Sequence, residues 1–353
     1  MTNLCAHFGV CGGCALQDIS DEACLTLKYR IVCDALAGHG LDAARVGHPH
    51  AVAPASRRRA SLAVSLRDGV AETGFRARRS HAVVDLRECR VLTPALVALV
   101  QSFRGIVPSL LRNGEEADLR LTETENGADL ALKLPRRCTP DVAQALSRWA
   151  TREGVARVTV NGRTAVQLAR PEATLAGVTV ALPESAFLQP TREGEAILQA
   201  HVCEAVGRAK RIVDLFAGCG TFALALARRA SVHAVDSDAG ALGALADAVR
   251  RASGLKPVTT EVRDLVRLPL QTREFDDYNA AVLDPPRAGA LAQAKMLAGS
   301  RIGRIAYVSC NPQSFARDAR VLADGDFEVG WVRPIDQFLW SSHIELVALF
   351  ERR

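Results

Sequence analysis

The chain lacks any long hydrophobic run. None of its apolar stretches approaches the ~18 residues that a membrane-spanning helix requires. Residues 1–14 contain neither a basic segment nor a hydrophobic core of the signal-peptide type. The sequence also contains no internal repeat and no low-complexity tail. We therefore expect a cytoplasmic protein with no membrane partner, and no segment indicates an obligate protein partner.

Lysine is rare, so arginine carries most of the positive charge. The formal net charge is +5, and arginines cluster in the N-terminal half at residues 57–59, 76–79 and 136–137. Arginine is a flat donor that can bind phosphate through two hydrogen bonds, so these clusters favour a polyanionic partner. A solvated basic surface without a partner is the alternative interpretation.

Cysteine is plentiful, in contrast, at 10 residues. Because no secretory signal is present, a disulfide framework is not expected, and metal-binding or catalytic roles are favoured. Three of the cysteines, Cys5, Cys11 and Cys14, lie close together near the N-terminus.

The two halves of the chain differ in pattern, which predicts two domains, residues 1–183 and 184–353. The first half contains paired strand patterns around Gly-containing turns and two helical patterns. The strand pairs are 58–66 with 69–76, 118–125 with 128–134, and 155–160 with 164–169, and the helices are 93–103 and 141–150. This half is predicted to be an α+β, β-rich unit built from hairpins, and a helix around 18–38 is expected to pack on the second domain.

From about residue 211, short apolar strands alternate with Ala-rich helices. The predicted strands are 211–215, 232–236, 258–263, 280–284 and 305–309, followed by 328–333 and 344–350 as an antiparallel edge. Alternation of this kind predicts βαβ units, a parallel sheet, and ligand sites at the carboxyl ends of its strands. The second half is therefore predicted to be a Rossmann-like α/β domain.

The first of these strands runs into a glycine turn. Gly218 and Gly220 would let the backbone approach a cofactor, and Asp236 at the end of the next strand could accept hydrogen bonds from both ribose hydroxyls. The spacing formally fits a dinucleotide, whereas Asp214 before the turn is typical of S-adenosylmethionine enzymes. A turn with a purely structural role is the remaining alternative.

The candidate chemistry lies at three strand ends. Asp284-Pro285-Pro286-Arg287 ends one strand, Cys310 follows the next, and Glu345 lies near the start of the last. A helix predicted to begin near Gln313 would lower the pKa of the Cys310 thiol, whereas a buried structural cysteine would be inert. A thiolate next to carboxylates indicates covalent catalysis.

Taken in order, these motifs resemble the RNA 5-methyluridine methyltransferase family. The matching segments are 187–190, 214–222, 284–289, 307–312 and 336–345. The resemblance implies a Rossmann-like class I methyltransferase domain preceded by an iron-sulfur and RNA-binding domain. Ser314 stands where the family usually has Thr, and Leu339-Trp340 stand where it usually has Pro and a polar residue.

The resemblance also implies roles for individual residues. Cys310 is expected to add to carbon 6 of uracil, and Glu345 is expected to remove the carbon 5 proton. Asp284 would contact either the uracil or the reacting end of the cofactor. The expected S-adenosylmethionine pocket comprises Gln189, Phe216, Gly218, Thr221, Asp236, Asp264 and Asp284.

Cys5, Cys11, Cys14 and Cys89 could ligate a metal if the first domain folds the chain back on itself. Four thiolates suit either tetrathiolate zinc or a 4Fe-4S cluster. Their spacing, with Gly12-Gly13 between two of them, resembles the iron-sulfur members of the same family, and this favours 4Fe-4S.

The expected partner is RNA, with rRNA favoured over tRNA. No segment ahead of Cys5 corresponds to the small RNA-binding barrel of some family members, which resembles the shorter branch acting on 23S rRNA. The alternatives are a tRNA 5-methyluridine enzyme, an RNA cytosine-5 methyltransferase, an exocyclic-amine methyltransferase, and a non-catalytic RNA-binding protein. Cytosine-5 enzymes place a cysteine where this chain has Arg287.

Overall fold

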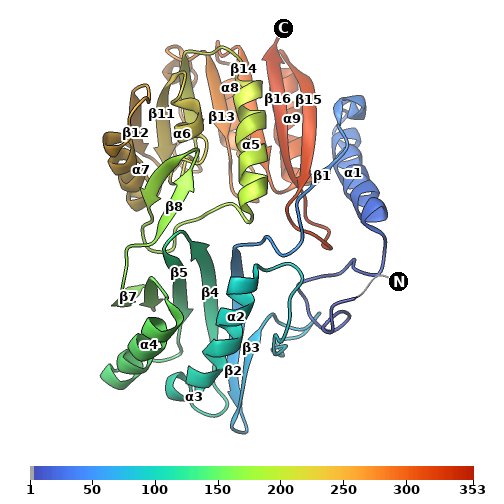
Figure 1. Ribbon diagram of the computed structural model, residues 1–353. Coiled ribbons are helices and arrows are strands. Elements are labelled where there is room, and N and C mark those ends of the chain that lie inside the picture. The colour runs from blue at the N-terminus through green and yellow to red at the C-terminus, as the bar shows by residue number, and fades with distance from the viewer. Residues whose placement is uncertain (1–3) are drawn as a thin grey trace.

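Two β-sheets organise the chain, one above the other in Figure 1. The computed structural model describes residues 4–353. The upper sheet, here called the large sheet, has eight strands in the order β1-β15-β16-β14-β13-β10-β11-β12. The lower, small sheet has six strands in the order β3-β2-β4-β5-β6-β7, and β8 and β9 form a separate pair. Across residues 4–353, no helix is both long and apolar enough to cross a membrane.

The large sheet has a parallel centre and an antiparallel end. Its parallel strands are β10 (Arg211–Leu215), β11 (Ser231–Asp236), β12 (Val258–Val262), β13 (Ala280–Leu283) and β14 (Arg304–Ser309). β16 (Glu345–Arg352) runs antiparallel between β14 and β15 (Phe327–Asp336), and β1 (His50–Ala51) pairs parallel with β15. The two final strands are therefore antiparallel as expected, but β1, which comes from the first half of the chain, lies outside them.

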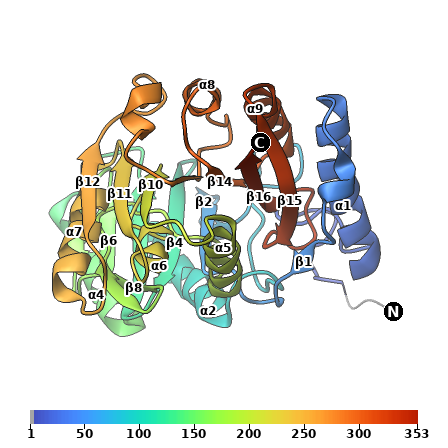
Figure 2. The same cartoon turned by 90° about the horizontal axis from the view of Figure 1, so that it is seen from above.

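Helices cover both faces of the large sheet, as the view from above shows (Figure 2). One face packs on α5 (Arg192–Ala205), α6 (Ala223–Leu226) and α7 (Ala239–Arg251), and the other on α1 (Asp21–Gly38), α8 (Leu291–Ala298) and α9 (Pro312–Asp324). The central strands are consequently apolar on both sides: Ile212 faces one core, and Val213 faces the other. A polar side chain in such a strand is therefore conspicuous, and Asp214 is fully buried there.

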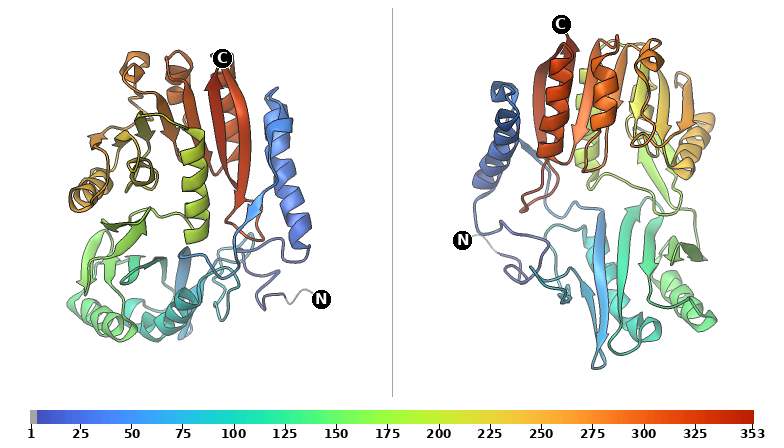
Figure 3. Two further views of the ribbon diagram at one scale, coloured as in Figure 1. Left: turned by 45° about the horizontal axis from the view of Figure 1, so that its top comes forward. Right: turned by 180° about the vertical axis from the view of Figure 1, so that it is seen from behind.

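The small sheet is covered by helices on one face only. Its strands are β2 (Arg59–Arg67), β3 (Val70–Gly74), β4 (Glu116–Thr124), β5 (Gly127–Lys133), β6 (Arg157–Val160) and β7 (Arg163–Gln167). Helices α2 (Pro94–Phe103), α3 (Val107–Leu110) and α4 (Pro140–Glu153) pack on one face, and the other is turned toward the viewer in the right-hand view of Figure 3. β4 alternates to match, because Leu119 and Leu121 are buried whereas Asp118 and Arg120 are exposed.

The expectation that the first half contains only hairpins is wrong at one point. β5 and β6 pair in parallel, and α4 makes the connection between them. The other pairings in this sheet are antiparallel. The smaller elements are β8 (Glu172–Leu175), β9 (Val178–Ala181) and the 3₁₀ turns Ala43–Arg45, Arg104–Ile106 and Thr272–Phe275.

A buried ion pair fastens α1 to the end of β15. Lys28 is fully buried, pairs with Asp336, and also donates to the Phe338 carbonyl oxygen at 3.0 Å. Burial lowers the pKa of Lys28 and raises that of Asp336, and the attraction between the two charges opposes both shifts. Asp336 Oδ1 also accepts a hydrogen bond from the Phe338 amide at 3.1 Å. The first half of the chain therefore holds the start of the loop between β15 and β16.

We expect Lys28→Met to destabilise the protein, because it leaves the Asp336 carboxylate buried without a cation. Loss of one partner of a buried pair costs about 3–5 kcal/mol. Urea unfolding should show this loss, and Lys133→Met, at an exposed position on β5, is the matched control. A Lys28→Met protein as stable as this control would contradict the importance of the pair.

Candidate active site

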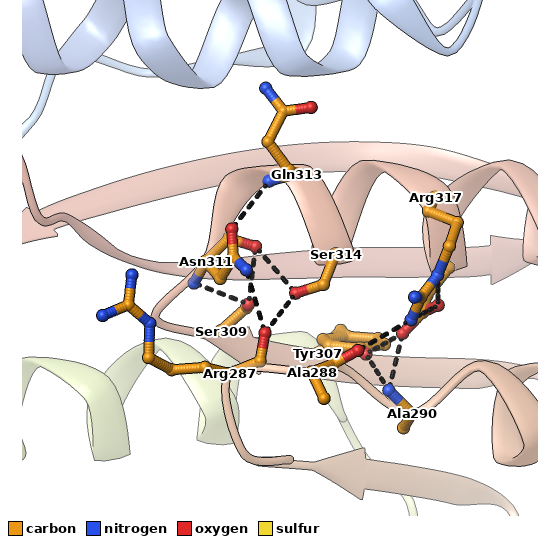
Figure 4. Close-up of polar contacts among 10 residues, drawn as sticks. Arg287, Ala288, Ala290, Tyr307, Ser309, Asn311, Gln313, Ser314 and Arg317 are labelled. Carbon is orange, nitrogen blue, oxygen red and sulfur yellow. Dashed lines mark hydrogen bonds and ion pairs between the residues drawn. The ribbon is translucent and has the colours of Figure 1, made fainter.

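Cys310 follows β14 directly, on the turn that leads into α9. Asn311 is the N-cap of α9, where its Oδ1 accepts a hydrogen bond from the Gln313 amide at 3.1 Å. The Asn311 amide in turn donates to Ser309 Oγ at 3.1 Å. Figure 4 shows these contacts, which fix the backbone on both sides of Cys310 at the carboxyl edge of the large sheet.

The loop after β13 is clamped to the first turn of α9 (Figure 4). The Arg287 carbonyl oxygen accepts hydrogen bonds from Asn311 Nδ2 at 2.9 Å and from Ser314 Oγ at 3.0 Å. Ser314, the departure from the usual Thr, thus supplies a hydroxyl that binds this loop. The Asp284 loop and the Cys310 turn are consequently held as one unit.

Gly289 allows this loop to approach α9 closely. Its φ is +78°, and a Cβ at this position would lie 2.5 Å from Asp318 Oδ2. That oxygen accepts hydrogen bonds from the Ala290 amide and the Tyr307 hydroxyl, each at 2.6 Å. Any side chain at residue 289 would therefore displace the carboxylate that anchors the loop.

A chain of amides connects the two candidate carboxylates. Gln189 Nε2 donates to Asp284 Oδ2 at 3.3 Å, and Gln337 Nε2 donates to Gln189 Oε1 at 3.0 Å and to Glu345 Oε2 at 3.3 Å. Gln337 and Glu345 are 1% and 4% exposed, whereas Asp284 retains some exposure. The arrangement therefore has a dry end at Glu345 and an accessible end at Asp284.

Gln337 is a residue that the sequence reasoning missed. It lies between Asp336 and Phe338, inside a matching segment, but nothing in its type or spacing marked it as part of the site. Its Oε1 has no hydrogen-bond partner among the described residues. Only the packing of β15 against the Gln189 segment shows that its amide joins Gln189 to Glu345.

Burial of several carboxyl groups in one place raises their pKa values. Burial and the charge of Asp284 raise the pKa of Glu345 well above its usual range, and the hydrogen bond from Gln337 opposes this. Burial raises the pKa of Asp284 to about 7. Burial and the charge of Asp284 also raise the pKa of Asp214. Such a site favours a cation, because a positive charge would stabilise the ionised carboxylates.

The expected lowering of the Cys310 pKa is wrong for the protein without substrates. Burial, together with the charges of Glu345 and Asp284, raises the pKa of this thiol to about 11, against an opposing effect of Arg287. The same result shows that Cys310, Glu345 and Asp284 are near enough to influence one another's ionisation.

The glycine turn after β10 lies at the same edge of the sheet. Phe216 and Gly218 have φ values of +64° and +53°, and the Gly218 amide donates to Asp236 Oδ2 at 2.8 Å. The Thr221 carbonyl oxygen accepts a hydrogen bond from Gln199 Nε2 at 3.0 Å. The structure therefore joins the turn to the end of β11, as expected for a nucleoside site.

Asp264 lies farther along this edge, on the segment after β12. Its side chain is exposed, and its Oδ1 accepts hydrogen bonds from the amides of Val266 at 3.0 Å and Arg267 at 3.2 Å. These bonds fix the local turn. The structure gives no contact between Asp264 and the other predicted pocket residues within the described part of the chain.

The four N-terminal candidate ligands gather around one cavity. Cys5, Cys11, Cys14 and Cys89 all line it, together with apolar side chains that include Phe8, Phe75, Leu86 and Val91. Burial raises the pKa of Cys14 to about 11, and the other three cysteines add to this. Among residues 4–353, no group of three or more His, Cys, Asp or Glu side chains is placed so that it could hold a metal ion.

The segment that contains Cys5, Cys11 and Cys14, here called the cysteine segment, contacts the small sheet on one side and the large sheet on the other. The Gly12 amide donates to the Arg76 carbonyl oxygen at 2.9 Å, and the Arg78 amide donates to that of Val10 at 2.9 Å. On the other side, the amides of Ala15 and Leu16 donate to the Trp340 carbonyl oxygen at 2.7 and 3.0 Å. This segment thus bridges the turn after β3 and the loop between β15 and β16.

Comparison with known proteins places these features in a family. The model of the tRNA (uracil-5-)-methyltransferase family matches residues 177–353. An uncharacterized RNA methyltransferase of Rhizobium meliloti is 41% identical over 99% of this chain and 85% of its own length. The 23S rRNA (uracil(1939)-C(5))-methyltransferase of Chromohalobacter salexigens is 32% identical over 99% of this chain and 76% of its own length.

A solved structure shows the same fold. The Pyrococcus abyssi tRNA (uracil-54, C5)-methyltransferase, in complex with S-adenosyl-L-homocysteine, matches with a TM-score of 0.76 at 22% identity. The match covers 96% of this chain and 84% of that one. The methyltransferase fold and the family predicted from the motifs are therefore confirmed: the chain belongs to the tRNA (uracil-5-)-methyltransferase family.

Proposed function

We propose that the protein transfers a methyl group from S-adenosylmethionine to carbon 5 of a uridine in RNA through a covalent Cys310 adduct. The observation that carries the proposal is the position of one thiol beside two carboxylates of raised pKa, at the carboxyl edge of a methyltransferase sheet. No packing requirement explains this combination of groups.

Cys310 has the role of the nucleophile. Its thiolate adds to carbon 6 of the uracil, and the electron pair displaced onto carbon 5 attacks the methyl group, which S-adenosylmethionine supplies on a sulfonium. Glu345 then takes the proton from carbon 5. The electrons of that carbon–hydrogen bond re-form the 5,6 double bond, and Cys310 leaves as thiolate. The raised pKa of Glu345 makes its ionised carboxylate a stronger base.

Because the pKa of Cys310 is high, the bound substrates must favour formation of its thiolate. The two carboxylates that oppose the thiolate would be neutralised in part by a sulfonium cation placed at their accessible end, near Asp284. The positive charge of Arg287 also lowers the pKa of Cys310. We therefore expect the reactive thiolate to form in the complete complex, so that the free enzyme does not react with other electrophiles.

The pocket for S-adenosylmethionine is proposed to follow the strand ends. Asp236 would accept the ribose hydroxyls, and Gly218 and Phe216 would let the backbone approach the nucleoside. Asp284 and Gln189 would face the reacting end, with Thr221 and Asp264 completing the pocket. Support comes from the positive φ values of the turn and from the raised pKa of Asp284, which favours a cation beside it.

The substrate is proposed to be 23S rRNA. The 32% identity to the Chromohalobacter salexigens rRNA enzyme, over nearly the whole chain, favours rRNA over tRNA. The target base must leave its stack to reach a half-buried thiol, so a single-stranded or flipped uridine is required. Arg287 at the position where cytosine-5 enzymes carry a cysteine argues against that alternative.

We further propose that Cys5, Cys11, Cys14 and Cys89 hold a 4Fe-4S cluster. Four thiols around one cavity have the donor set that such a cluster requires. Tetrathiolate zinc, the alternative, would use the same four thiolates with each sulfur about 2.3 Å from one ion. The cluster would cross-link the cysteine segment to Cys89. The segment, through its backbone hydrogen bonds to Arg76 and Trp340, would then hold the turn after β3 and the loop between β15 and β16.

The covalent step can be tested with RNA that contains 5-fluorouridine. Fluorine at carbon 5 cannot leave as a cation, so Cys310 should stay attached after methyl transfer. Wild-type protein with S-adenosylmethionine should form an RNA–protein complex stable to denaturing electrophoresis, and Cys310→Ala should form none. A wild type that methylates uridine without trapping this RNA would contradict the covalent mechanism.

Glu345→Gln should separate methyl transfer from product release. Without a base for the carbon 5 proton, turnover should fall by about 10²- to 10⁴-fold. Ordinary RNA should then accumulate as a methylated adduct on Cys310, which intact-mass spectrometry would detect. If Glu345→Gln releases 5-methyluridine at the wild-type rate, another group is the base.

The cluster proposal predicts about four iron and four sulfide per chain in protein purified without oxygen. Ser replacement of Cys89 should remove most of the iron, whereas Ser replacement of Cys138, which lies outside the cavity, should not. Zinc without iron in the wild-type protein would overturn the assignment.

A further inference from the structure

The uncovered face of the small sheet contains a groove rich in arginine. Its walls are formed by residues 61–63 of β2, residues 118–120 of β4 and the turn at 75–79, with Gly12 at one end. The opposite face of the same strands packs on the helices α2 to α4. The groove therefore lies on a sheet that is supported from behind by these helices.

Most of the charge in the groove is unpaired. Arg78, Arg79 and Arg120 are exposed, and none of them pairs with a carboxylate within residues 4–353. Arg76 does pair, with Glu116 at 3.0 Å and Asp118 at 3.9 Å. Three guanidinium groups on this surface therefore have no carboxylate partner, and each can donate hydrogen bonds to phosphate oxygens.

The same strand leads from the groove to the active site. Arg59, at the start of β2, donates from Nη1 to the Leu188 carbonyl oxygen at 2.7 Å, beside Gln189. Its guanidinium lies 4.2 Å from the centre of the exposed Phe187 ring. Burial and the charges of Arg57, Arg120 and Arg58 lower the pKa of Arg59 to about 10. Arg58 is paired with Glu195 at 2.6 Å, but Arg57, Arg59 and Arg120 have no carboxylate partner within residues 4–353, so the path suits the binding of an anion.

We propose that this groove binds the phosphodiester backbone of the single-stranded RNA that flanks the target uridine. The proposal rests on the function proposed above, since it concerns the same RNA. Arg78, Arg79 and Arg120 contact phosphates, and Arg59 marks the passage of the strand to the catalytic site. An open groove with separated arginines suits a flexible chain of evenly spaced anions, and contacts of this kind position a substrate without reading its bases.

The binding test uses a fluorescein-labelled single-stranded RNA of mixed sequence and fluorescence anisotropy over a range of salt concentrations. In the triple variant Arg78→Gln, Arg79→Gln, Arg120→Gln, the slope of log Kd against log salt should fall by about 2, since each phosphate contact to single-stranded RNA contributes about 0.7. At 0.1 M salt, Kd should rise roughly 10- to 100-fold. The loss should be similar for RNAs of different sequence.

The matched control removes three other exposed arginines. Arg148 on α4, Arg208 after α5 and Arg251 at the end of α7 also have no ion pair within the described residues, and they lie outside the groove. The control triple Gln variant should bind as wild type does, which separates a local contact from a general effect of net charge. An equal loss of RNA affinity in both triple variants, or no loss in either, would overturn the proposal that the groove binds RNA.

Two further measurements separate this proposal from the proposed function. Binding of S-adenosylhomocysteine, measured by calorimetry, should be the same in wild type and in both variants, because the groove lies outside the predicted cofactor pocket. Formation of 5-methyluridine by wild type, with unchanged RNA binding by the groove variant, would overturn the groove and leave the function intact. A wild type that binds RNA but forms no 5-methyluridine would refute the proposed function. The anisotropy comparison would still show whether the groove binds RNA.

Discussion

The protein depends on keeping acidic groups and a thiol together where little water reaches them. Glu345 and Asp214 are buried, Asp284 is partly so, and burial raises the pKa of all three. Such a site is stable only if every group has a fixed donor or a neutral form. The Gln189 and Gln337 amides supply donors between Asp284 and Glu345, so the two carboxyl groups are positioned by one connected chain of hydrogen bonds.

The rest of the structure supports that arrangement from both sides. On one side, α9 and the loop containing Gly289 hold the Cys310 turn against Asp284. On the other, α1 holds the end of β15 through Lys28, and the cysteine segment binds the Trp340 carbonyl. The loop that leads to Glu345 is therefore held by elements from the beginning of the chain. The first half contains none of the proposed catalytic residues, but its contacts support the loop that leads to one of them.

Much of the architecture could be predicted from local patterns. Short apolar runs between Ala-rich helices located the parallel strands, because the central strands of the large sheet are covered on both faces. The parallel pairing of β5 and β6 and the addition of β1 to the large sheet were not predictable in this way. Both depend on contacts between distant segments, and a strand as short as His50–Ala51 has no periodicity to detect.

The sequence by itself determined the family and the proposed reactive groups, because Cys310, Asp284 and Glu345 lie in motifs whose order and spacing are specific. Only the tertiary structure decided their ionisation. A pKa depends on burial and on every charge nearby, so the thiol that the helix start was expected to acidify has its pKa raised to about 11 instead. The role of Gln337 and the arginine groove were likewise decided by the fold, since each brings together residues that are far apart in the sequence.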